Sequence, residues 1–455
     1  MSKGKVYLIG AGPGDPGLLT CRAKQLLSDC DVVCYDKLVS AAILSVVPAH
    51  VQLYQVGYRG YQGCHIDYGM HPDVLAFAHS GKRVARLKAG DPCIFGRMTE
   101  ECRDLEAHQI DYELVPGITA ALGAAAYSGF PLTSGGIASS VTFVSGHKSS
   151  DSIASWGALG QDGGTLVLYM GAKQLAKHVQ NFIRQGRSPE TPIALIFSAT
   201  SADHHCVVAT LASIADKVAG LQQAGPALVI VGEVVAQAKE FDWCARLPLF
   251  GSRVLLCGDY PQQQAISELG AEVIQVDSLP CESSIHAEDW RFFANQVELG
   301  FADLSSFKLW WQSLKQQQRD IRQFRMPMGS DDPAVCRALE ALGIAPAVLS
   351  EHALILTLDA LERDPNSRYH NIGQRLSQAL AYPLPSVDWL LVEDSAIAAS
   401  LYKHHAEALQ GAKLIALNER VRDWATQQGH VLGEAEALSL FDLPEALVYE
   451  AADVA

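Results

Sequence analysis

The sequence predicts an α/β protein, and two observations carry this prediction. An apolar run at 6–9 is followed by a glycine-rich turn, a segment with helical spacing at 18–27 and a second apolar run at 31–35. This order of strand, helix and strand is typical of a parallel sheet. The same alternation starts again after residue 251. Because the chain has 455 residues, of which 49% are hydrophobic and 19% charged, we expect about two to four globular domains.

The first α/β domain is expected to span residues 1–115. Further strands are predicted at 84–87 and 112–115, and each of them runs into a turn of small residues. A helix is predicted between these strands at 98–108, where the apolar residues have helical spacing.

A second α/β domain is expected at 116–246 and a separate α/β module at 251–455. Four strands of the second domain are predicted at 141–144, 165–169, 193–197 and 227–231. They alternate with helical stretches near 173–186 and 211–223. The segment 247–251 is the predicted boundary. Strands of the last module are predicted at 253–257, 272–274, 388–392 and 413–417.

Composition argues against several classes of function. The formal net charge of −15 argues against nucleic acid as the main partner, because phosphate binding needs a basic surface. The 11 cysteines are scattered without a Cys-x-x-Cys pair, which predicts a reducing compartment and neither a disulfide framework nor a zinc site. The sequence shows no signal peptide and no apolar run of about 20 residues, so we expect a soluble cytoplasmic protein without a membrane span.

The glycine-rich loop 10–15 follows the first strand. A dinucleotide-binding turn would read Gly-x-Gly-x-x-Gly, with an acid at the end of the second strand, where Asp36 lies. However, the third glycine position is Asp15, and Pro13 lacks a backbone N–H donor, so a pyrophosphate and a nicotinamide-dependent oxidoreductase are disfavoured. A tight strand-to-helix turn and a loop shaped for a different ligand both remain open.

Three further loops, at 86–97, 115–121 and 169–171, follow predicted strands. Their small residues allow a ligand to lie against the backbone, and their position at strand ends in two domains favours a shared cleft. The cations of the first of these loops are equally consistent with carboxylate binding and with a solvated charged edge. Because the net charge of the chain is negative, an acidic substrate would need a local group of cations to hold it. The candidate residues for this group are Arg59, Arg83, Arg86, Lys88 and Arg97.

In this order and spacing the loops resemble the tetrapyrrole methylase family, and within it the uroporphyrinogen-III C-methyltransferases. The resemblance spans about residues 3–243 and is carried by the strings at 10–15, 18–20, 35–39, 90–92, 95–97, 115–119, 145–147, 169–171, 191–194 and 231–235. It implies a two-domain fold with S-adenosyl-L-methionine in the interdomain cleft and a homodimer formed through the methylase domains. The implied reaction is C-methylation of uroporphyrinogen III to precorrin-2, for sirohaem or cobalamin biosynthesis.

The resemblance also implies roles for individual residues. Asp36 would be the catalytic proton acceptor, a role that a carboxylate can fill when a proton leaves the macrocycle. The implied cofactor contacts are Pro13, Ala89, Gly90, Asp91, Ile94, Thr119, Ala120, Met170 and Ala199.

This chain departs from the family pattern mainly at positions that would handle the substrate. Tyr58 replaces a lysine that is the proposed proton donor, and Ser134 and Gly135 replace a His-Arg pair. The departures predict S-adenosylmethionine binding with altered or weakened substrate handling. A degenerate, non-catalytic protein that binds a tetrapyrrole or S-adenosylmethionine is the alternative.

The last module resembles the uroporphyrinogen-III synthase family, through strings at 253–256, 268–274, 388–392 and 426–431. The resemblance implies two α/β lobes and a second, synthase-like activity whose product is the substrate of the methylase. The Phe-Thr-Ser turn of that family is replaced at 393–395, so a degenerate scaffold is equally open.

Two adjacent histidine pairs, His204-His205 and His404-His405, do not indicate a metal site. Side chains of neighbouring residues diverge on a strand or helix, so one ion rarely takes both.

Overall fold

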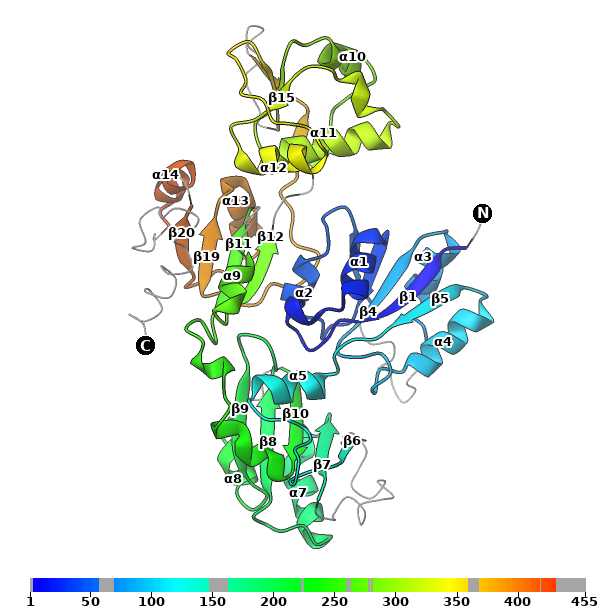
Figure 1. Ribbon diagram of the computed structural model, residues 1–455, viewed down its shortest axis with the longest axis vertical. Coiled ribbons are helices and arrows are strands. Elements are labelled where there is room, and N and C mark those ends of the chain that lie inside the picture. Colours follow the sequence, from blue (N-terminus) through cyan, green and yellow to red (C-terminus); the bar gives the residue numbers. More distant parts are fainter. Residues whose placement is uncertain are drawn as a thin grey trace.

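The computed structural model describes residues 3–56, 69–146, 163–221, 225–258, 263–276, 279, 281–358, 368–417 and 419–430. Their strands form five sheets, of which three belong to the segment after residue 251 (Figure 1). The α/β class predicted from the sequence is confirmed, since strands and helices alternate through these ranges.

The amino-terminal domain is a parallel sheet in the order β3-β2-β4-β1-β5. Its strands are β1 (Lys5–Gly10), β2 (Val32–Tyr35), β3 (Gln52–Gln55), β4 (Val84–Lys88) and β5 (Asp111–Val115). Its helices are α1 (Cys21–Asp29), α2 (Ala41–Ser45), α3 (Pro72–His79) and α4 (Met98–Ala107), with a 3₁₀ turn η1 at Pro16–Leu18. The predicted strands are confirmed, and β1, β2 and β4 are almost entirely buried, although β4 carries Arg86 and Lys88. The strand β3 was not predicted, since it is an edge strand with exposed ends and no clear period.

The second domain is a mixed sheet in the order β6-β7-β10-β8-β9. Its strands are β6 (Val141–Ser145), β7 (Thr165–Tyr169), β8 (Pro192–Phe197), β9 (His205–Thr210) and β10 (Ala227–Val231). Within it β6 and β7 are parallel, whereas β10 runs antiparallel to β7 and β8, and β9 antiparallel to β8. The four predicted strands are confirmed. The half-exposed β9 was missed.

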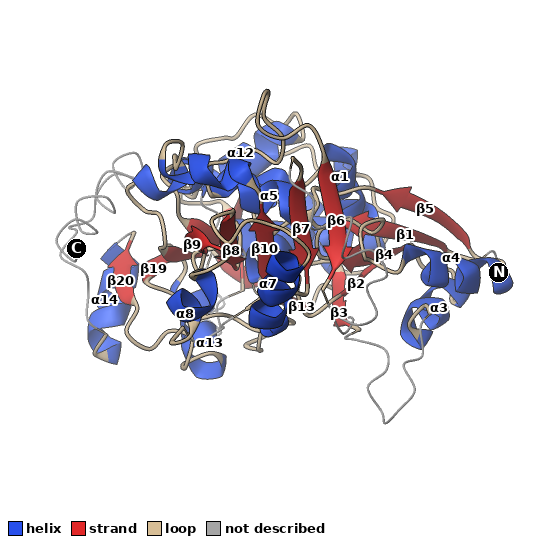
Figure 2. Ribbon diagram, turned by 90° about the horizontal axis from the view of Figure 1, so that it is seen from below, coloured by secondary structure: helices blue, strands red, loops and turns tan. Residues whose placement is uncertain are grey.

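Helices cover both faces of this second sheet (Figure 2). They are α5 (Ala120–Tyr127), α7 (Leu175–Arg184) and α8 (Ile214–Val218), with 3₁₀ helices η3 (Ala172–Gln174), η4 (Glu233–Lys239) and η5 (Cys244–Arg246). The small residues of α5 pack on one face, and the apolar stripe of α7 packs on the other. The alanine-rich sequence of α5 supplies the small side chains that pack there.

The segment after residue 251 contains two α/β lobes. The first has the parallel sheet β12-β11-β19-β20, with strands β11 (Arg253–Cys257), β12 (Glu272–Val276), β19 (Trp389–Val392) and β20 (Lys413–Ala416). Its helices are α9 (Gln263–Glu268), α13 (Ser395–His404) and α14 (Glu419–Gln428). All four of its strands were predicted to within two or three residues.

The second lobe is inserted between β12 and β19 and has the sheet β15-β14-β16-β17. Its elements are α10 (Asp289–Ala294), β14 (Leu299–Phe301), α11 (Leu304–Gln316), η6 (Ile321–Gln323), β15 (Met328–Gly329), α12 (Pro333–Ala341), β16 (Leu354–Thr357) and β17 (Tyr369–Asn371). A small antiparallel pair, β13 (Cys281–Ser283) with β18 (Gly373–Arg375), lies where the chain enters and leaves the lobe. Its core is rich in aromatic residues, among them Trp290, Trp310 and Phe301.

The first lobe packs directly against the amino-terminal domain. Ala41 and Ala42 of α2 join the lobe's core, and the Ser45 hydroxyl accepts a hydrogen bond from the backbone N–H of Gln275 at 3.3 Å. Conversely, Tyr382 of the first lobe, which precedes β19, packs into the core of the amino-terminal domain. The Tyr35 hydroxyl donates to the carbonyl of Ala381 at 2.6 Å. The three-domain boundaries expected from the sequence stay a prediction.

The adjacent residues His204 and His205 diverge. The ring of His204 is buried and accepts a hydrogen bond from the N–H of Thr200, while His205 begins β9 and stacks on Phe197.

Among the described residues, no helix has the length and apolar character needed to cross a bilayer.

Candidate active site

Three loops of the amino-terminal domain meet at the carboxyl ends of β1, β4 and β5. Gly12 and Gly90 exchange backbone hydrogen bonds, with N···O distances of 3.1 and 2.8 Å. Asp91 then joins the third loop, because its Oδ2 accepts a hydrogen bond from the N–H of Gly117 at 2.8 Å. The other carboxylate oxygen of Asp91 accepts from the N–H of Cys93 at 2.7 Å. Asp91 therefore acts as a clamp between the loops that follow β4 and β5.

Glycine is required where these loops touch. A Cβ atom at Gly10 would lie 2.5 Å from the nitrogen of Gly117 and 2.7 Å from the carbonyl oxygen of Gly90. A Cβ at Gly117 would lie 2.5 Å from the same carbonyl oxygen. Because all of these neighbours are backbone atoms, none can rotate away, and the loops must separate to admit a side chain.

We expect Gly10→Ala to lower the free energy of unfolding of this domain by about 1–3 kcal/mol, because the added methyl group meets fixed backbone. Gly135→Ala is the matched control, since a Cβ there has no neighbour within 4 Å. Thermal unfolding of the two variants measures the difference. Equal stability of both variants would show that the glycine contact is not tight.

Asp15, at the third glycine position of the first loop, connects the two domains. Its N–H donates to the Thr200 hydroxyl at 3.2 Å, and its carboxylate accepts from the Tyr127 hydroxyl and from the N–H of Gly17. Burial, and then the Asp15 carboxylate, raise the pKa of Tyr127 well above its ordinary value. The Asp15 carboxylate therefore fastens the loop 10–15 to α5, and the Asp15 backbone N–H fastens it to the loop after β8.

The second domain contributes Tyr169 and Met170 from the end of β7. The Tyr169 hydroxyl pairs with the Thr119 hydroxyl at 2.6 Å and accepts from the N–H of Ala121 at 3.2 Å. The ring of Phe95, from the loop after β4, lies 5.0 Å from the Tyr169 ring. Met170 is 50% exposed, so it is not a core residue.

Left-handed backbone is concentrated around this junction. Phe95, Met170, Ser198 and Thr200 have φ values of 54°, 57°, 43° and 68°, although none is a glycine. Such conformations persist where surrounding contacts impose them, and they are common at functional sites.

The structure brings the nine predicted cofactor residues to this domain junction. Pro13 lies on the first loop, where its ring would clash with any Cβ at Gly123 of α5. Ala89, Gly90, Asp91 and Ile94 follow β4, Thr119 and Ala120 start α5, Met170 follows β7, and Ala199 follows β8. Ala199 and Ala120 pack against the same core cluster, and the Ala199 carbonyl oxygen lies next to Gly14. Their contact with a cofactor stays a prediction.

Asp36 lies at the end of β2, beside the end of β4, and belongs to a cluster of four charged residues. Its N–H donates to the carbonyl of Leu87 at 3.2 Å, and its Oδ1 accepts from Arg86 Nη2 at 2.5 Å. Arg86 Nε and Lys88 Nζ both donate to Glu101 Oε1, at 3.2 and 2.8 Å. The side chains of Arg86, Lys88 and Glu101 are about 6–7% exposed, whereas that of Asp36 is 29% exposed. Burial opposes the charge on Arg86, but Asp36 and Glu101 outweigh it and raise its pKa.

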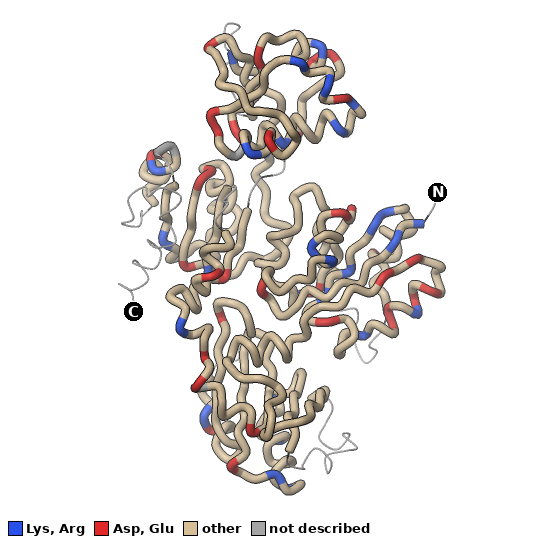
Figure 3. The backbone as a smooth tube through the Cα atoms, viewed as in Figure 1, with Lys and Arg blue, Asp and Glu red and all other residues tan. Residues whose placement is uncertain are grey.

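The expectation of a local basic patch is wrong for three of its five residues. Arg86 and Lys88 are buried against carboxylates, so they offer no exposed positive charge. Arg83 precedes β4 and lies at the opposite end of that strand, beside the Tyr7 ring. Arg97 stands before α4, near the junction, and Arg59 lies outside the described residues, as does Tyr58. Figure 3 shows basic residues spread over the whole molecule rather than gathered at this junction.

Sequence reasoning missed Glu101, Tyr127 and Thr200 as site residues, whereas Tyr169 lies in the predicted ligand loop 169–171. For Glu101 a signal existed, since it lies on the inner face of the amphipathic helix α4, next to buried Cys102 and Leu105. A carboxylate at such a position needs a buried cation. The partners of Tyr127 and Thr200 come from the other domain and are not visible in the sequence.

A cavity of about 630 Å³ adjoins this junction on the side of the first lobe. Asp15, Tyr127 and Thr200 line it, together with Trp243 and with residues of α9 and β12. None of the nine predicted cofactor residues lines it, so the cavity is distinct from the predicted cofactor site.

The sequence matches the family of tetrapyrrole (corrin/porphyrin) methylases over residues 5–215. An S-adenosyl-L-methionine-dependent uroporphyrinogen III methyltransferase of Methanosarcina barkeri is 41% identical over 237 residues, which are 51% of this chain and 92% of that protein. The chain belongs to the tetrapyrrole methylase family. Its relatives are methyltransferase enzymes, as the resemblance in the sequence implied.

Other relatives match this methylase over part of their length. The siroheme synthases of Acinetobacter baylyi and Psychromonas ingrahamii are 44% and 45% identical over 242 and 246 residues, or 53% of this chain and 53% and 51% of theirs. The chain thus spans about half the length of the siroheme synthases that it matches. A uroporphyrin-III C-methyltransferase of Thermus thermophilus, solved with S-adenosyl homocysteine, has 35% identity over 51% of this chain and 93% of that chain, with a TM-score of 0.44.

Proposed function

We propose that the chain is an S-adenosylmethionine-dependent C-methyltransferase that converts uroporphyrinogen III to precorrin-2. The observation that carries the proposal is the contact of three glycine loops at Gly10, Gly90 and Gly117, beside Tyr169 and Met170 of the second domain. The name of the Methanosarcina relative, which the chain matches over 92% of that protein's length, supports the same activity.

The residues at the junction fit S-adenosylmethionine. Ala89, Gly90 and Ala199 have no side chain beyond Cβ that would fill the space over the backbone, and Met170, whose backbone is left-handed, is half-exposed at the end of β7. Pro13, Ala89, Gly90, Asp91, Ile94, Thr119, Ala120, Met170 and Ala199 would hold the cofactor, which supplies an electrophilic methyl group. Holding both reactants in line supplies much of the rate of such a transfer.

Asp36 would accept the proton that leaves the macrocycle after methylation. Its carboxylate is oriented by Arg86 and still partly exposed, so a substrate can reach it. General base catalysis of this kind contributes about 10²–10⁴-fold to a rate.

The remaining parts of the proposal follow from the resemblance. The methylase would be a cytoplasmic homodimer whose product feeds sirohaem or cobalamin biosynthesis. Residues 251–455 would be a uroporphyrinogen-III synthase-like module, and their two lobes joined at the β13–β18 pair agree with this assignment. Domain boundaries at 115–116 and 246–251 belong to the same proposal.

An anaerobic assay with uroporphyrinogen III and S-adenosylmethionine tests the activity, with the absorbance of precorrin-2 as the readout. Calorimetry with S-adenosylmethionine tests the cofactor. Binding without turnover would identify the non-catalytic alternative, and the absence of binding would reject the proposal as a whole.

Tyr58→Lys is expected to raise turnover, because it restores the proton donor that the family has at this position. A tyrosine with its ordinary pKa of about 10 is a different acid from a lysine in geometry and charge. The assay above, run on both proteins at equal concentration, measures the gain. Unchanged turnover would show that Tyr58 does not limit the reaction.

A further inference from the structure

The loop 198–203, after β8, is held in an unusual conformation. Ser198 and Thr200 both have left-handed backbone, and Ala199 between them is a predicted cofactor contact. Regular secondary structure gives these residues no support, since the loop links β8 to β9 across a turn. Hydrogen bonds within the second domain hold the two residues, because the Ser198 N–H donates to the carbonyl of Pro226 at 2.8 Å and the Thr200 N–H donates to His204 Nδ1 at 3.3 Å.

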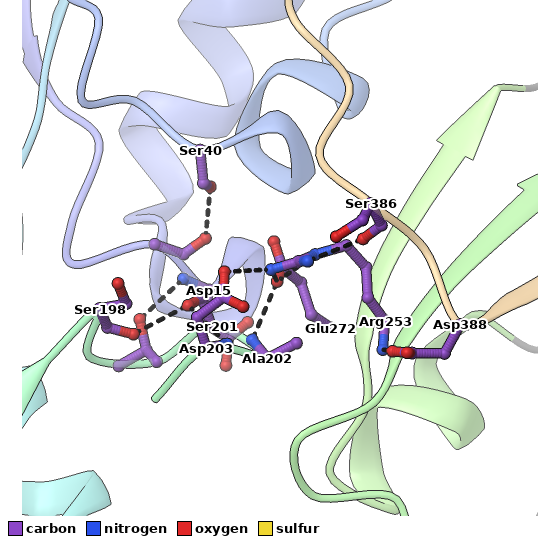
Figure 4. Close-up of polar contacts among 12 residues, drawn as sticks. Asp15, Ser40, Ser198, Ser201, Ala202, Asp203, Arg253, Glu272, Ser386 and Asp388 are labelled. Atoms are coloured by element: carbon purple, nitrogen blue, oxygen red, sulfur yellow. Dashed lines mark hydrogen bonds and ion pairs between the residues drawn. The ribbon is translucent and has the colours of Figure 1, made fainter. Parts of the chain in front are cut away.

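The other end of the loop, at Ala202 and Asp203, is held by the first lobe of the C-terminal module. Arg253, the first residue of β11, donates from Nη2 to Asp203 Oδ2 at 2.7 Å and from Nε to Glu272 Oε2 at 2.9 Å. The same Glu272 oxygen accepts a hydrogen bond from the backbone N–H of Ala202 at 2.9 Å. Figure 4 shows Arg253 and Glu272 reaching from the lobe to the loop.

The lobe also fixes Arg253 itself. Its Nη1 donates to the carbonyl of Ser386 at 2.8 Å, and its backbone N–H donates to Asp388 Oδ2 at 2.7 Å. The planar guanidinium thus has three different acceptors in fixed directions, which a lysine could not satisfy.

The contacts in this cluster differ in strength. Asp203 has a side chain that is 65% exposed, so water screens its pair with Arg253 and the pair contributes little. The side chains of Arg253 and Glu272 are only 6% and 7% exposed. Removing one partner of a buried ion pair lowers stability far more than breaking an exposed pair, because it leaves the other charge buried without its partner. The link Arg253–Glu272–Ala202 therefore carries most of the attachment.

On its other side the loop supports the first glycine loop. The Thr200 hydroxyl accepts from the N–H of Asp15, and the Gly14 carbonyl accepts from the Ser40 hydroxyl at 2.7 Å. The 630 Å³ cavity is lined by Asp15 and Thr200 of these loops on one side and by residues of α9 and β12 on the other. Glu272 of the ion-pair cluster also lines this cavity, so the cluster connects the lobe to the loop beside it.

We propose that the C-terminal module braces the cofactor site, and that Arg253 and Glu272 are positioning residues which hold the loop 198–203 against the loop 10–15. The identity of the ligand rests on the proposed function, whereas the brace itself does not. The module would then serve the methylase whether or not it has a synthase-like activity of its own.

Hydrogen exchange on the full chain without ligand tests the brace directly. Arg253→Ala is expected to speed exchange at the amide of Ala202 and its neighbours about tenfold, because the loop opens more often. Arg375→Ala is the control, since it removes a partly buried ion pair with Asp303 that involves no residue of the loop 198–203. Unchanged exchange in Arg253→Ala, or equal acceleration in both variants, would overturn the proposal.

Cofactor affinity tests the consequence for the site. For Arg253→Ala we expect S-adenosylmethionine to bind about tenfold more weakly, with a matching rise in its KM and little change in kcat. Arg253→Lys should restore only part of the affinity, and Arg375→Ala should bind like the unmodified chain. Should Arg253→Ala fail to fold, Glu272→Gln provides the same comparison with less loss of packing.

The two proposals fail in different ways. If the unmodified chain binds no S-adenosylmethionine, the proposed function fails, and the hydrogen-exchange result alone decides the brace. If the unmodified chain binds and Arg253→Ala binds equally well, the brace fails while the proposed function stands.

Discussion

Asp36→Asn is expected to lower kcat for methyl transfer by about 10²–10⁴-fold, because the amide cannot accept the proton that leaves the macrocycle. The side chain keeps its shape and can still contact Arg86. Asp36 is not among the predicted cofactor contacts, so the affinity for S-adenosylmethionine should hold. The anaerobic precorrin-2 assay and calorimetry together separate the two effects.

Asp31→Asn is the matched control for this variant. Asp31 precedes the same strand, β2, at its other end, where its Oδ2 accepts from the N–H of Arg83 at 2.7 Å. We expect this variant to keep its activity. Turnover by Asp36→Asn within about tenfold of the unmodified chain would exclude Asp36 as the principal base.

Glu101→Ala is expected to cost about 3–5 kcal/mol of local stability, because it leaves Arg86 and Lys88 buried with only the Asp36 carboxylate nearby. This cost corresponds to faster hydrogen exchange in β4 by about two to three and a half orders of magnitude. Glu101→Gln should lie between the alanine variant and the unmodified chain, since it keeps an acceptor but loses the charge.

Glu113→Ala is the matched control for Glu101→Ala. Glu113 also pairs with two cations, Lys5 and Arg22, at 2.9 and 2.8 Å, but all three side chains are 30–47% exposed. Surface pairs of this kind contribute about 0–1 kcal/mol. A similar effect of the two alanine substitutions on exchange would contradict the view that burial makes the Glu101 cluster important.

Much of the fold was predictable because buried strands carry a strong local signal. The apolar runs of β1 and β10 predict central strands, and the glycines at or just after their ends mark the turns at which loops emerge. Strands with half-exposed patterns, such as β3 and β9, were missed because their residues give no clear period. The direction of β10, antiparallel to its neighbours, likewise has no signature in its sequence.

The part of the site that the backbone of the glycine loops forms was predictable from the sequence. Gly10, Gly90 and Gly117 are visible in the sequence, and their mutual contact follows from the shared edge of a parallel sheet. The charges were not predictable, because a sequence shows that Arg86 and Lys88 are cations but not that Glu101 lies beside them.

By itself, the sequence determined the α/β class, the order of the loops and the family, because these depend on local patterns along the chain. The tertiary structure alone decided which charges are available, since Arg86 and Lys88 are neutralised by residues up to 50 positions away. It also decided that Arg253 holds the loop after β8. Such pairings depend on distances between segments that folding brings together, and no local pattern encodes those distances.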